Sequence, residues 1–364
     1  MEIGWGEIMF LQGSHAALPV RVRSVILASL LVLTLASPRQ IVAWGNTGHE
    51  AVAWVAWQQL KPATQTRIMQ LLAMVPTLQN PAHTKSIPGY QDWINDLPAG
   101  LSTDDRNLYL FMRAATWADT IKHEWLQDSD TPPKNSPPSE PAIGYSDTAS
   151  HGYWHFVDDG FASDKSAVPP TPAPNAATQI VVFRTGIAVN DGALDLLKSY
   201  ELVWLLHLVG DVHQPLHGAV RFFGNQGDEG GNTVKITMPT AMKKLFEGTL
   251  SKSAPSELHA FWDDLPGEGS PAPALPFAVT FAKALPAAGA ESLNDIDPND
   301  WAVESLKMAQ KDAYASPIGK GPAPTSGSSY SITQAYYNTA LRDARLRIAL
   351  AGARLAKLLN ENLH

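Results

Sequence analysis

Two short segments of this chain repeat one spacing of metal-binding residue types, a histidine followed four residues later by an aspartate. The first pair is His207 and Asp211, and the second is His259 and Asp263. On an α-helix, a step of four residues places both side chains on the same face, one turn apart. Each pair can therefore hold a metal ion between an imidazole and a carboxylate.

The residues around the first pair strengthen this interpretation. His207 lies among leucines, where a lone histidine is more often a hydrogen-bonded core residue than a ligand. A buried Asp211 one turn further on would be costly unless a cation paired with it. Downstream, Pro215 cannot continue a helix and is expected to bend the chain, so that His217 faces a neighbouring ion.

Composition limits the possible metal chemistry. The 364 residues include no cysteine, so imidazole, carboxylate or backbone groups must hold any metal, which suits zinc. The formal net charge of -8 argues against a basic surface that binds a polyanion along its length. Bound dications can reverse the sign at one place, so a phosphate group can still bind there.

The first 43 residues are expected to be a signal peptide. Arg21 and Arg23 precede an apolar run at residues 25–36, which is short for a membrane span, and Ala43 ends an acceptable cleavage site. The mature chain would begin at Trp44, without a membrane anchor, and would be periplasmic or secreted. A retained anchor is the alternative.

Apolar residues at helical spacing predict a mainly α protein, a single compact helical domain over residues 44–364. Asn46 or Thr47 would cap a first helix that has His49 in its first turn. Further helices are expected at residues 64–73, 180–198, 200–213 and 332–359.

Other segments predict a strand and several loops. Residues 233–238 alternate like a strand and would form one arm of a small β-hairpin. Proline-rich segments at residues 129–141, 167–176 and 266–276 are interpreted as loops. They are not domain linkers, because metal-type residues on both sides of the first two would then be separated.

The order of the motifs resembles the single-strand-specific zinc nuclease family of the S1/P1 type. Residues 44–49, 117–119 and 155–158 are similar to its first three motifs, and residues 207–217 and 259–263 match the last two. The resemblance covers essentially the whole chain after residue 43 and implies the helical fold that these nucleases share with zinc-dependent phospholipase C. Without cysteines or an N-glycosylation sequon, the chain is similar to bacterial rather than fungal members.

The resemblance implies three zinc ions. The first would be held by Asp119, His155, His207 and Asp211, the second by His217, His259 and Asp263, and the third by the amine and carbonyl of Trp44, with His49 and a bridging Asp211. A free α-amine, with a pKa of about 7.7 to 8.0, can bind metal near neutral pH, whereas an internal amide is a poor ligand. Removal of residues 1–43 would therefore complete the site.

The resemblance also implies hydrolysis of single-stranded DNA and RNA to 5'-mononucleotides, together with 3'-nucleotidase activity and no protein partner. Asp119, Asp211 and Lys122 would be catalytic, and Lys122 would reach the substrate phosphate. Phe156 would stack a base and Asp158 would hydrogen-bond to it, which favours unstacked single strands. The alternatives are a solvated lysine at 122 and core packing at 156.

Two other functions remain open at this stage. A zinc-dependent phospholipase C has the same fold and three-ion arrangement, but its last ligand of the second ion is typically glutamate, where this chain has Asp263. A non-catalytic zinc-binding protein would fill every coordination position with protein groups. The ligands counted above are too few to saturate three ions.

Overall fold

The computed structural model describes residues 44–364 except for residues 76–77, 80–85, 88, 143–147, 163, 252, 268–274, 290–292, 320, 322–327 and 364. The expected signal peptide, residues 1–43, lies outside the described residues. The described chain belongs to one unit, residues 41–364. None of its helices is both long enough and apolar enough to cross a membrane.

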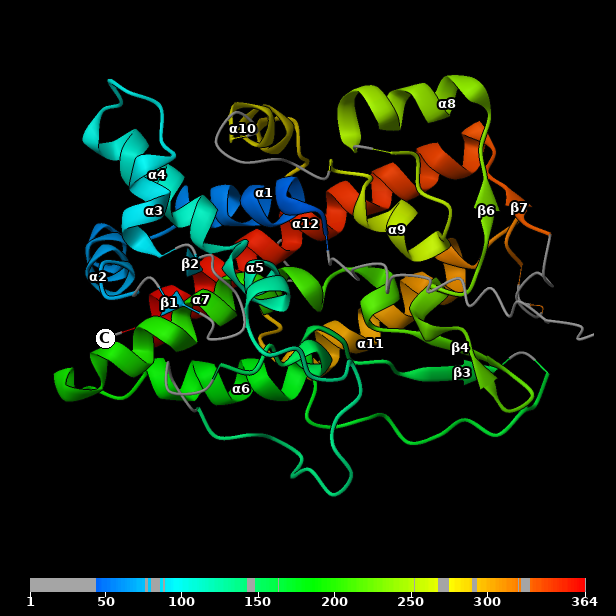
Figure 1. Cartoon of the computed structure of the whole chain (residues 1–364), viewed down its shortest axis with the longest axis horizontal. Helices are drawn as coiled ribbons and strands as arrows, with labels where there is room; N and C mark the ends of the chain where they lie inside the picture. Colours follow the sequence, from blue (N-terminus) through cyan, green and yellow to red (C-terminus); the bar gives the residue numbers. More distant parts are fainter. Residues whose placement is uncertain are drawn as a thin grey trace, which may run out of the picture. The chain divides into compact units, whose positions relative to one another are not determined.

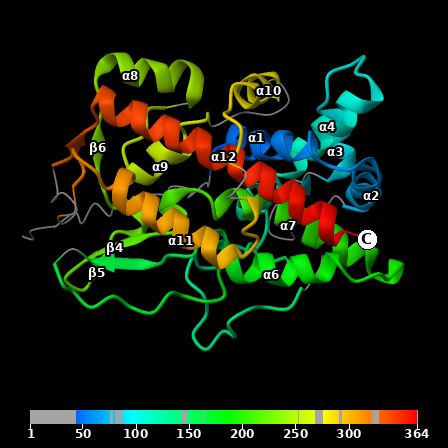
Figure 2. The same cartoon turned by 180° about the vertical axis from the view of Figure 1, so that it is seen from behind.

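The centre of the fold is α7 (Asp195–Asp211), which is buried from Lys198 to its end. Because apolar residues occur on every side of this helix, every side must be covered by other elements. It packs against α6 (Ala176–Ile187), α12 (Gln334–Asn362) and α2 (Pro62–Leu72). Figures 1 and 2 show α7 between α6 and α12.

The first helix, α1 (Asn46–Trp57), packs closely along α12. Gly352 permits this approach, since a Cβ at that position would lie 2.5 Å from Cβ of Val55. The other sides of α1 contact α7, α4 (Thr103–Ala114) and α10 (Leu275–Lys283). The start of α1 is therefore fixed beside the central helix.

Shorter helices complete the core. They are α3 (Tyr90–Asn95), α5 (Trp117–Glu124), α8 (Thr240–Leu245), α9 (Leu258–Asp263) and α11 (Pro298–Met308). Local sequence explains several helix starts: the Ser102 hydroxyl accepts from Asp105 N at α4, and Asp297 caps α11, which begins with Pro298.

The strands are short. In the described chain, β1 (Leu78–Gln79) pairs with β2 (Ser86–Ile87), β3 (Gly160–Ala162) runs parallel to β4 (Val220–Phe223), β4 forms an antiparallel hairpin with β5 (Gln226–Gly227), and β6 (Ile236–Thr237) runs parallel to β7 (Tyr330–Ser331). The β3–β4 pair joins the chain that follows His155 to the chain that follows His217.

The mainly α fold is confirmed, as are helices close to residues 64–73 and 332–359. His49 lies in the first turn of α1, but the predicted caps are wrong, because Gly45 occupies the N-cap position and Asn46 begins the helix. The predicted helix at residues 180–198 is confirmed at both ends but is not continuous. The helix α6 ends at Ile187, and the Asp191 carboxylate accepts from Ala193 N to start a separate turn before α7 begins at Asp195.

The predicted strand at residues 233–238 is confirmed only at Ile236–Thr237, and its predicted hairpin is wrong. Its partner β7 is parallel and distant in sequence, while the hairpin belongs to β4 and β5. The loop at residues 129–141 is confirmed, because it contains no helix or strand, and the loop at residues 167–176 is confirmed up to residue 175, since Ala176 begins α6. The third predicted loop is shorter than expected, because Leu275 begins α10.

Candidate metal centre

Six segments bring the nine predicted metal ligands into the interior. Trp44 and His49 come from the start of α1, Asp119 from α5, His155 from the 3-10 turn Gly152–His155, His207 and Asp211 from α7, His217 from the turn Pro215–His217, and His259 and Asp263 from α9. All nine are buried, and even Asp119 is only 5% exposed.

Eight of these side chains form three groups suited to metal ions. The groups are His49, His207 and Asp211; Asp119, His155 and His207; and His217, His259 and Asp263, with the ligand atoms of each group within 4.8 Å of one another. Both His-x-x-x-Asp pairs have the expected geometry. His207 Nε2 lies 3.3 Å from Asp211 Oδ2, and His259 Nε2 lies 3.5 Å from Asp263 Oδ2.

The third group shows most directly where a cation can bind. Nδ1 of His217 donates to the carbonyl of His155 at 2.8 Å, and Nδ1 of His259 donates to the carbonyl of Gly230 at 2.8 Å. In neutral imidazoles both Nε2 atoms are then acceptors, yet they lie 3.2 Å apart. Two lone pairs at this distance repel each other unless a cation lies between them.

Burial keeps these imidazoles neutral. It lowers the pKa of His217 well below its usual range and lowers the pKa of His259 to about 4. Burial also opposes charge on His207, but the carboxylates of Asp211 and Asp119 outweigh it and raise the pKa of His207 to about 10. This part of the centre therefore attracts positive charge, which a proton or a metal ion can supply.

Buried polar atoms without hydrogen-bond partners mark the other two groups. They include both ring nitrogens of His49, Nε2 of His155 and Oδ1 of Asp211. Leaving such groups unsatisfied in the interior is costly, whereas metal coordination satisfies imidazole and carboxylate together. The residues present therefore fit metal ions at these positions.

Trp44 lies beside the centre. Its indole nitrogen donates to the carbonyl of Gly210 at 3.1 Å, and the next residue, Gly45, donates its backbone N–H to the carbonyl of Asp263 at 2.9 Å. Gly210 also leaves space for His49, since a Cβ there would lie 2.8 Å from Nδ1 of that histidine. These contacts hold the start of α1 against both His-x-x-x-Asp pairs.

Lys122 and Phe156 flank the centre. Nζ of Lys122 lies 3.0 Å from Oδ1 of Asp119 and 5.8 Å from the centroid of the Phe156 ring. That ring lies 4.7 Å from the ring of His217. Phe156 is 6% exposed, and it lines a pocket. The ammonium group of Lys122 and the aromatic ring of Phe156 thus border the same metal groups.

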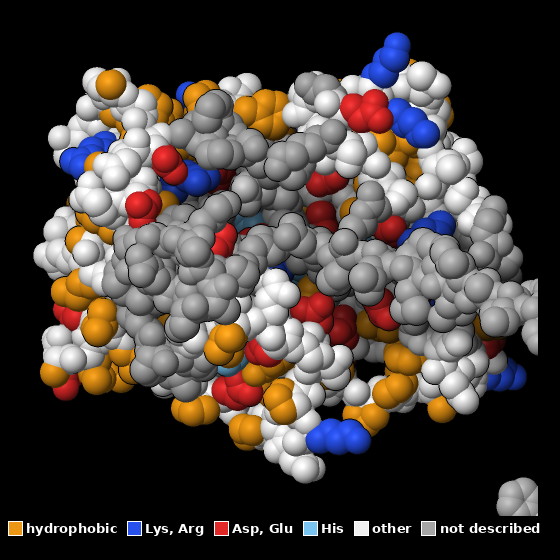
Figure 3. Space-filling view, in the orientation of Figure 1, with side chains coloured by type: hydrophobic (Ala, Val, Ile, Leu, Met, Phe, Trp, Pro, Cys, Tyr) orange, Lys and Arg blue, Asp and Glu red, His pale blue; other side chains and the backbone are white. Residues whose placement is uncertain are grey.

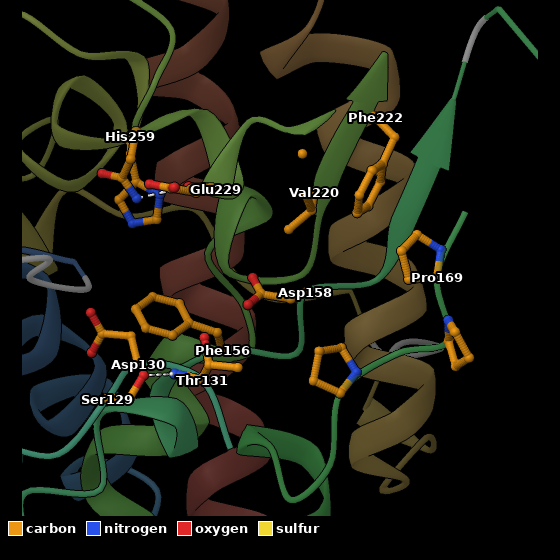
Figure 4. Close-up of a pocket in the computed structure, with 14 residues that line it drawn as sticks. Ser129, Asp130, Thr131, Phe156, Asp158, Pro169, Val220, Phe222, Glu229 and His259 are labelled. Carbon is orange, nitrogen blue, oxygen red and sulfur yellow. Dashed lines mark hydrogen bonds between the residues drawn. The ribbon is translucent and has the colours of Figure 1, made fainter. Parts of the chain in front are cut away.

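The pocket beside Phe156 has a volume of about 550 Å³. It is lined by Ser129, Asp130, Thr131, Phe156, Asp158, Pro169, Pro170, Pro172, Val220, Phe222, Gly227, Glu229, Asn232 and His259. Figure 4 shows Phe156 and Asp158 between the side that carries His259 and the side formed by the prolines. The pocket therefore adjoins the metal centre through His259.

Asp158 lies in this pocket with a backbone φ of +56°, in the left-handed region. Burial and then the neighbouring carboxylates, including Asp130 and Glu229, raise the pKa of Asp158 to about 7. The pocket is thus strongly acidic. Acidic side chains gather near the middle of the face seen in Figure 1, as Figure 3 shows.

Some residues of the site were not predicted from the sequence. Gln214 donates from Nε2 to Oδ1 of Asp263 at 2.7 Å and so orients a candidate ligand. Asp130 and Glu229 line the pocket from segments without a metal motif. The proline-rich composition around Pro169 indicated a loop, but nothing in it indicated which surface the loop covers.

Buried metal-binding groups next to a pocket with an aromatic wall are typical of metal-dependent enzymes, and this protein has both features. The family model described as S1/P1 Nuclease matches residues 44–364. Endonuclease 4 of Arabidopsis thaliana is 31% identical over 343 residues, which cover 88% of this chain and 89% of that protein. Nuclease S1 of Aspergillus oryzae is 24% identical over 259 residues, which cover 69% and 64%.

The chain therefore belongs to the S1/P1 nuclease family. It is a nuclease, a hydrolase that acts on phosphodiester bonds of nucleic acids. This result favours the nuclease over the phospholipase C and the non-catalytic zinc-binding protein that the sequence had left open. Its three buried groups of histidine and aspartate can bind metal ions.

Proposed function

We propose that this nuclease uses three zinc ions to hydrolyse single-stranded DNA and RNA to 5'-mononucleotides, and that it also acts on 3'-nucleotides. The opposed Nε2 atoms of His217 and His259, 3.2 Å apart, are the observation that carries the proposal. A cation between these atoms would lie at one end of the pocket that Phe156 and His259 line. Family membership supplies the nucleic-acid substrate.

The proposed ligand sets differ from the three groups in two ways: Asp211 joins Asp119, His155 and His207, and Trp44 replaces His207 beside His49 and Asp211. The first ion would take Asp119, His155, His207 and Asp211; the second His217, His259 and Asp263; the third Trp44, His49 and Asp211. Imidazole and carboxylate donors without thiolates suit zinc. Bound zinc would lower the pKa of water to near 7 and stabilise charge on the phosphoryl oxygens.

The chain's own residues would bind and orient the substrate. Lys122, held by its ion pair with Asp119, would donate to the substrate phosphate. Phe156 would stack one base, which orients the phosphate toward the metal groups. A base in a duplex is paired and stacked, so it cannot enter this pocket without first leaving the helix. This requirement favours single strands.

Metal analysis combined with a substrate panel tests the proposal. We expect three zinc ions per chain, and hydrolysis of single-stranded DNA, RNA and 3'-nucleotides without hydrolysis of phosphatidylcholine. Zinc-loaded protein that cuts duplex and single strands equally would contradict the strand preference. Cleavage of phosphatidylcholine alone would contradict the choice of substrate.

Replacing Phe156 tests the stacking role. Phe156→Ala should weaken binding of a single-stranded oligonucleotide by about tenfold, because stacking of one base contributes about 1 to 3 kcal/mol. Zinc content should not change. Phe223→Ala is the matched control, because Phe223 lies on the adjoining strand but is 42% exposed and does not line the pocket. Equal affinities of the two variants would contradict stacking at Phe156.

We also propose that residues 1–43 direct the protein to the periplasm or outside the cell, and that their removal frees the amine of Trp44 for the third ion. The contacts of Trp44 and Gly45 beside Gly210 and Asp263 support this proposal, because they bring the backbone of Trp44 to the centre. A precursor blocked at Ala43 should bind less zinc and turn over slowly. Full zinc content and activity in that precursor would exclude the role of the amine.

A further inference from the structure

The pocket beside Phe156 contains two carboxylates that the proposed function leaves without a role. Asp130 and Glu229 line it from two segments far apart in sequence. Both raise the pKa of Asp158, and all three carboxylates line the same pocket. Figure 4 shows Asp130 beside Phe156, and Glu229 on the side that carries His259.

The loop that carries Asp130 is firmly attached next to the metal centre. The Asp128 carboxylate accepts from Ser150 Oγ at 2.6 Å, from His151 N at 3.1 Å and from Gly152 N at 3.2 Å. Asp130 itself lies against Gly152, where a Cβ would collide with its carboxylate. The position of Asp130 is thus set by the turn that ends in the candidate ligand His155.

Glu229 is fixed to the other side of the centre. It has a φ of +52°, and the next residue, Gly230, has a φ of +59° and accepts a hydrogen bond from the candidate ligand His259. The carbonyl of Glu229 accepts from the Asn232 side chain at 2.7 Å. The backbone that orients His259 therefore also positions the Glu229 side chain.

Negative and positive charges lie at different ends of the pocket. Its lining contains no lysine or arginine among the described residues, but it includes Asp130, Asp158 and Glu229. Lys122 and the metal groups lie beyond Phe156. A nucleotide phosphate would therefore be attracted toward the metal groups, and its base would then lie among the carboxylates. Ionised carboxylates only accept hydrogen bonds, so they select groups that donate.

We propose that Asp130 and Glu229 make the nuclease selective for bases with N–H donors, with guanine preferred most and uracil and thymine least. Guanine presents N1–H and its 2-amino group side by side, which matches a carboxylate. Adenine and cytosine present one amino group, while uracil and thymine present a single N–H between two carbonyl oxygens that carboxylates repel. This inference rests on the proposed function and specifies its substrate.

Dinucleotides with two identical bases test the inference. Whichever of the two bases enters the pocket, its identity is known. We expect kcat/KM for GpG to exceed that for UpU by about tenfold, which corresponds to about 1.4 kcal/mol. The inosine dinucleotide IpI, which lacks the 2-amino groups, should fall between them. This comparison needs no variant and so does not depend on folding of a mutant.

Asp130→Asn and Glu229→Gln should each reduce the ratio of GpG to UpU severalfold, because an amide can donate to the uracil oxygens. Thermal unfolding and zinc content, measured in parallel, show whether each variant is intact. Glu247→Gln replaces a carboxylate that is exposed like Asp130 and Glu229 but lies outside the pocket, so it should keep the wild-type ratio.

The outcomes separate the inference from the proposed function. If no dinucleotide is hydrolysed by the zinc-loaded enzyme, the proposed function itself is wrong. If all are hydrolysed within twofold of one another, the function stands and the base preference is wrong. A guanine preference that persists unchanged in intact Asp130→Asn and Glu229→Gln variants would also overturn the assignment to these residues.

Discussion

Buried histidines lie on two sides of the C-terminal end of α7, and they differ in the partners of their ring nitrogens. On one side, Nε2 of His217 faces Nε2 of His259 at 3.2 Å, with no donor between two acceptors. On the other side, Nδ1 of His213 donates to the Val209 carbonyl at 2.8 Å, and its Nε2 accepts from Arg354 at 2.9 Å. His213 and His217 are both fully buried.

The side around His213 is satisfied by protein groups. Arg354 also pairs with Glu304 at 2.7 Å, Arg347 donates to the His213 carbonyl at 3.0 Å, and Ser305 donates to the Val212 carbonyl at 2.6 Å. Burial and then the two arginines lower the pKa of His213 well below its usual range. This network attaches α11 and α12 to the turn that carries the candidate ligands.

Burial alone therefore does not identify a metal ligand. A buried histidine with a donor and an acceptor partner contributes to the structure, as His213 does. A buried histidine whose second nitrogen faces another acceptor requires a cation.

The largest expected effect is on the ligand side. His217→Ala should remove the second of the three proposed ions and lower kcat by roughly a thousandfold, because a metal contributes several kcal/mol to stabilisation of the transition state. Zinc per chain and single-turnover hydrolysis measure the two effects. Normal zinc stoichiometry in this variant would contradict the assignment of His217.

The opposite side should respond in stability rather than in metal binding. Arg354→Met leaves Glu304 and His213 without this donor, so the free energy of unfolding should fall by about 3 kcal/mol. Chemical denaturation of the zinc-loaded protein measures it. Zinc stoichiometry of the folded fraction should stay at the wild-type value, and loss of zinc with unchanged stability would remove the distinction between the two sides.

Gln214 connects the two sides, and its replacement should have an intermediate effect. Gln214→Leu removes the donor to Asp263 but keeps a side chain of similar size. Zinc affinity should fall roughly tenfold to a hundredfold, as found when a group that orients a ligand is lost. Competition with a chelator measures the affinity. An unchanged zinc affinity would show that the hydrogen bond from Gln214 is not needed to orient Asp263 for metal binding.

The smallest effect is expected at Glu201, a buried carboxylate of α7 that is 2% exposed. Burial raises its pKa from 4.5 to about 7, against the opposing effect of Lys198. The folded state therefore holds this proton more tightly than the unfolded state, and the wild-type protein loses stability as pH rises from about 4.5 to 7.

Glu201→Gln should remove that loss. The variant should gain about 2 kcal/mol over wild type at pH 6 and almost nothing at pH 4, so the difference between their unfolding free energies should grow across this window. Both proteins share the metal centre, whose own pH dependence cancels in the difference. A difference that does not vary with pH would show that Glu201 ionises normally.

The sequence predicted most of the secondary structure near the centre. Four-residue spacing placed His207 with Asp211, and His259 with Asp263, on common helix faces, because helical geometry is local. It also indicated the bend at Pro215, after which the chain enters a separate 3-10 turn. The break after Ile187 was missed, since the apolar spacing continues while Asp191 starts a new turn.

Other parts of the site could not be predicted because they depend on contacts between distant segments. The carbonyl of Gly230 orients His259, and the carbonyl of His155 orients His217, yet backbone groups leave no mark in the sequence. Likewise, the sequence did not assign Asp130 and Glu229 to one pocket.

The sequence by itself indicated eight side chains that the structure gathers into groups able to hold metal ions, the helical faces of the two His-x-x-x-Asp pairs and the family of the chain. Only the tertiary structure decided that six segments meet, that His213 pairs with Arg354 while His217 faces His259, and that the pocket is acidic. Spacing along a helix is fixed by backbone geometry, whereas a partner across the core is fixed by packing of the whole chain.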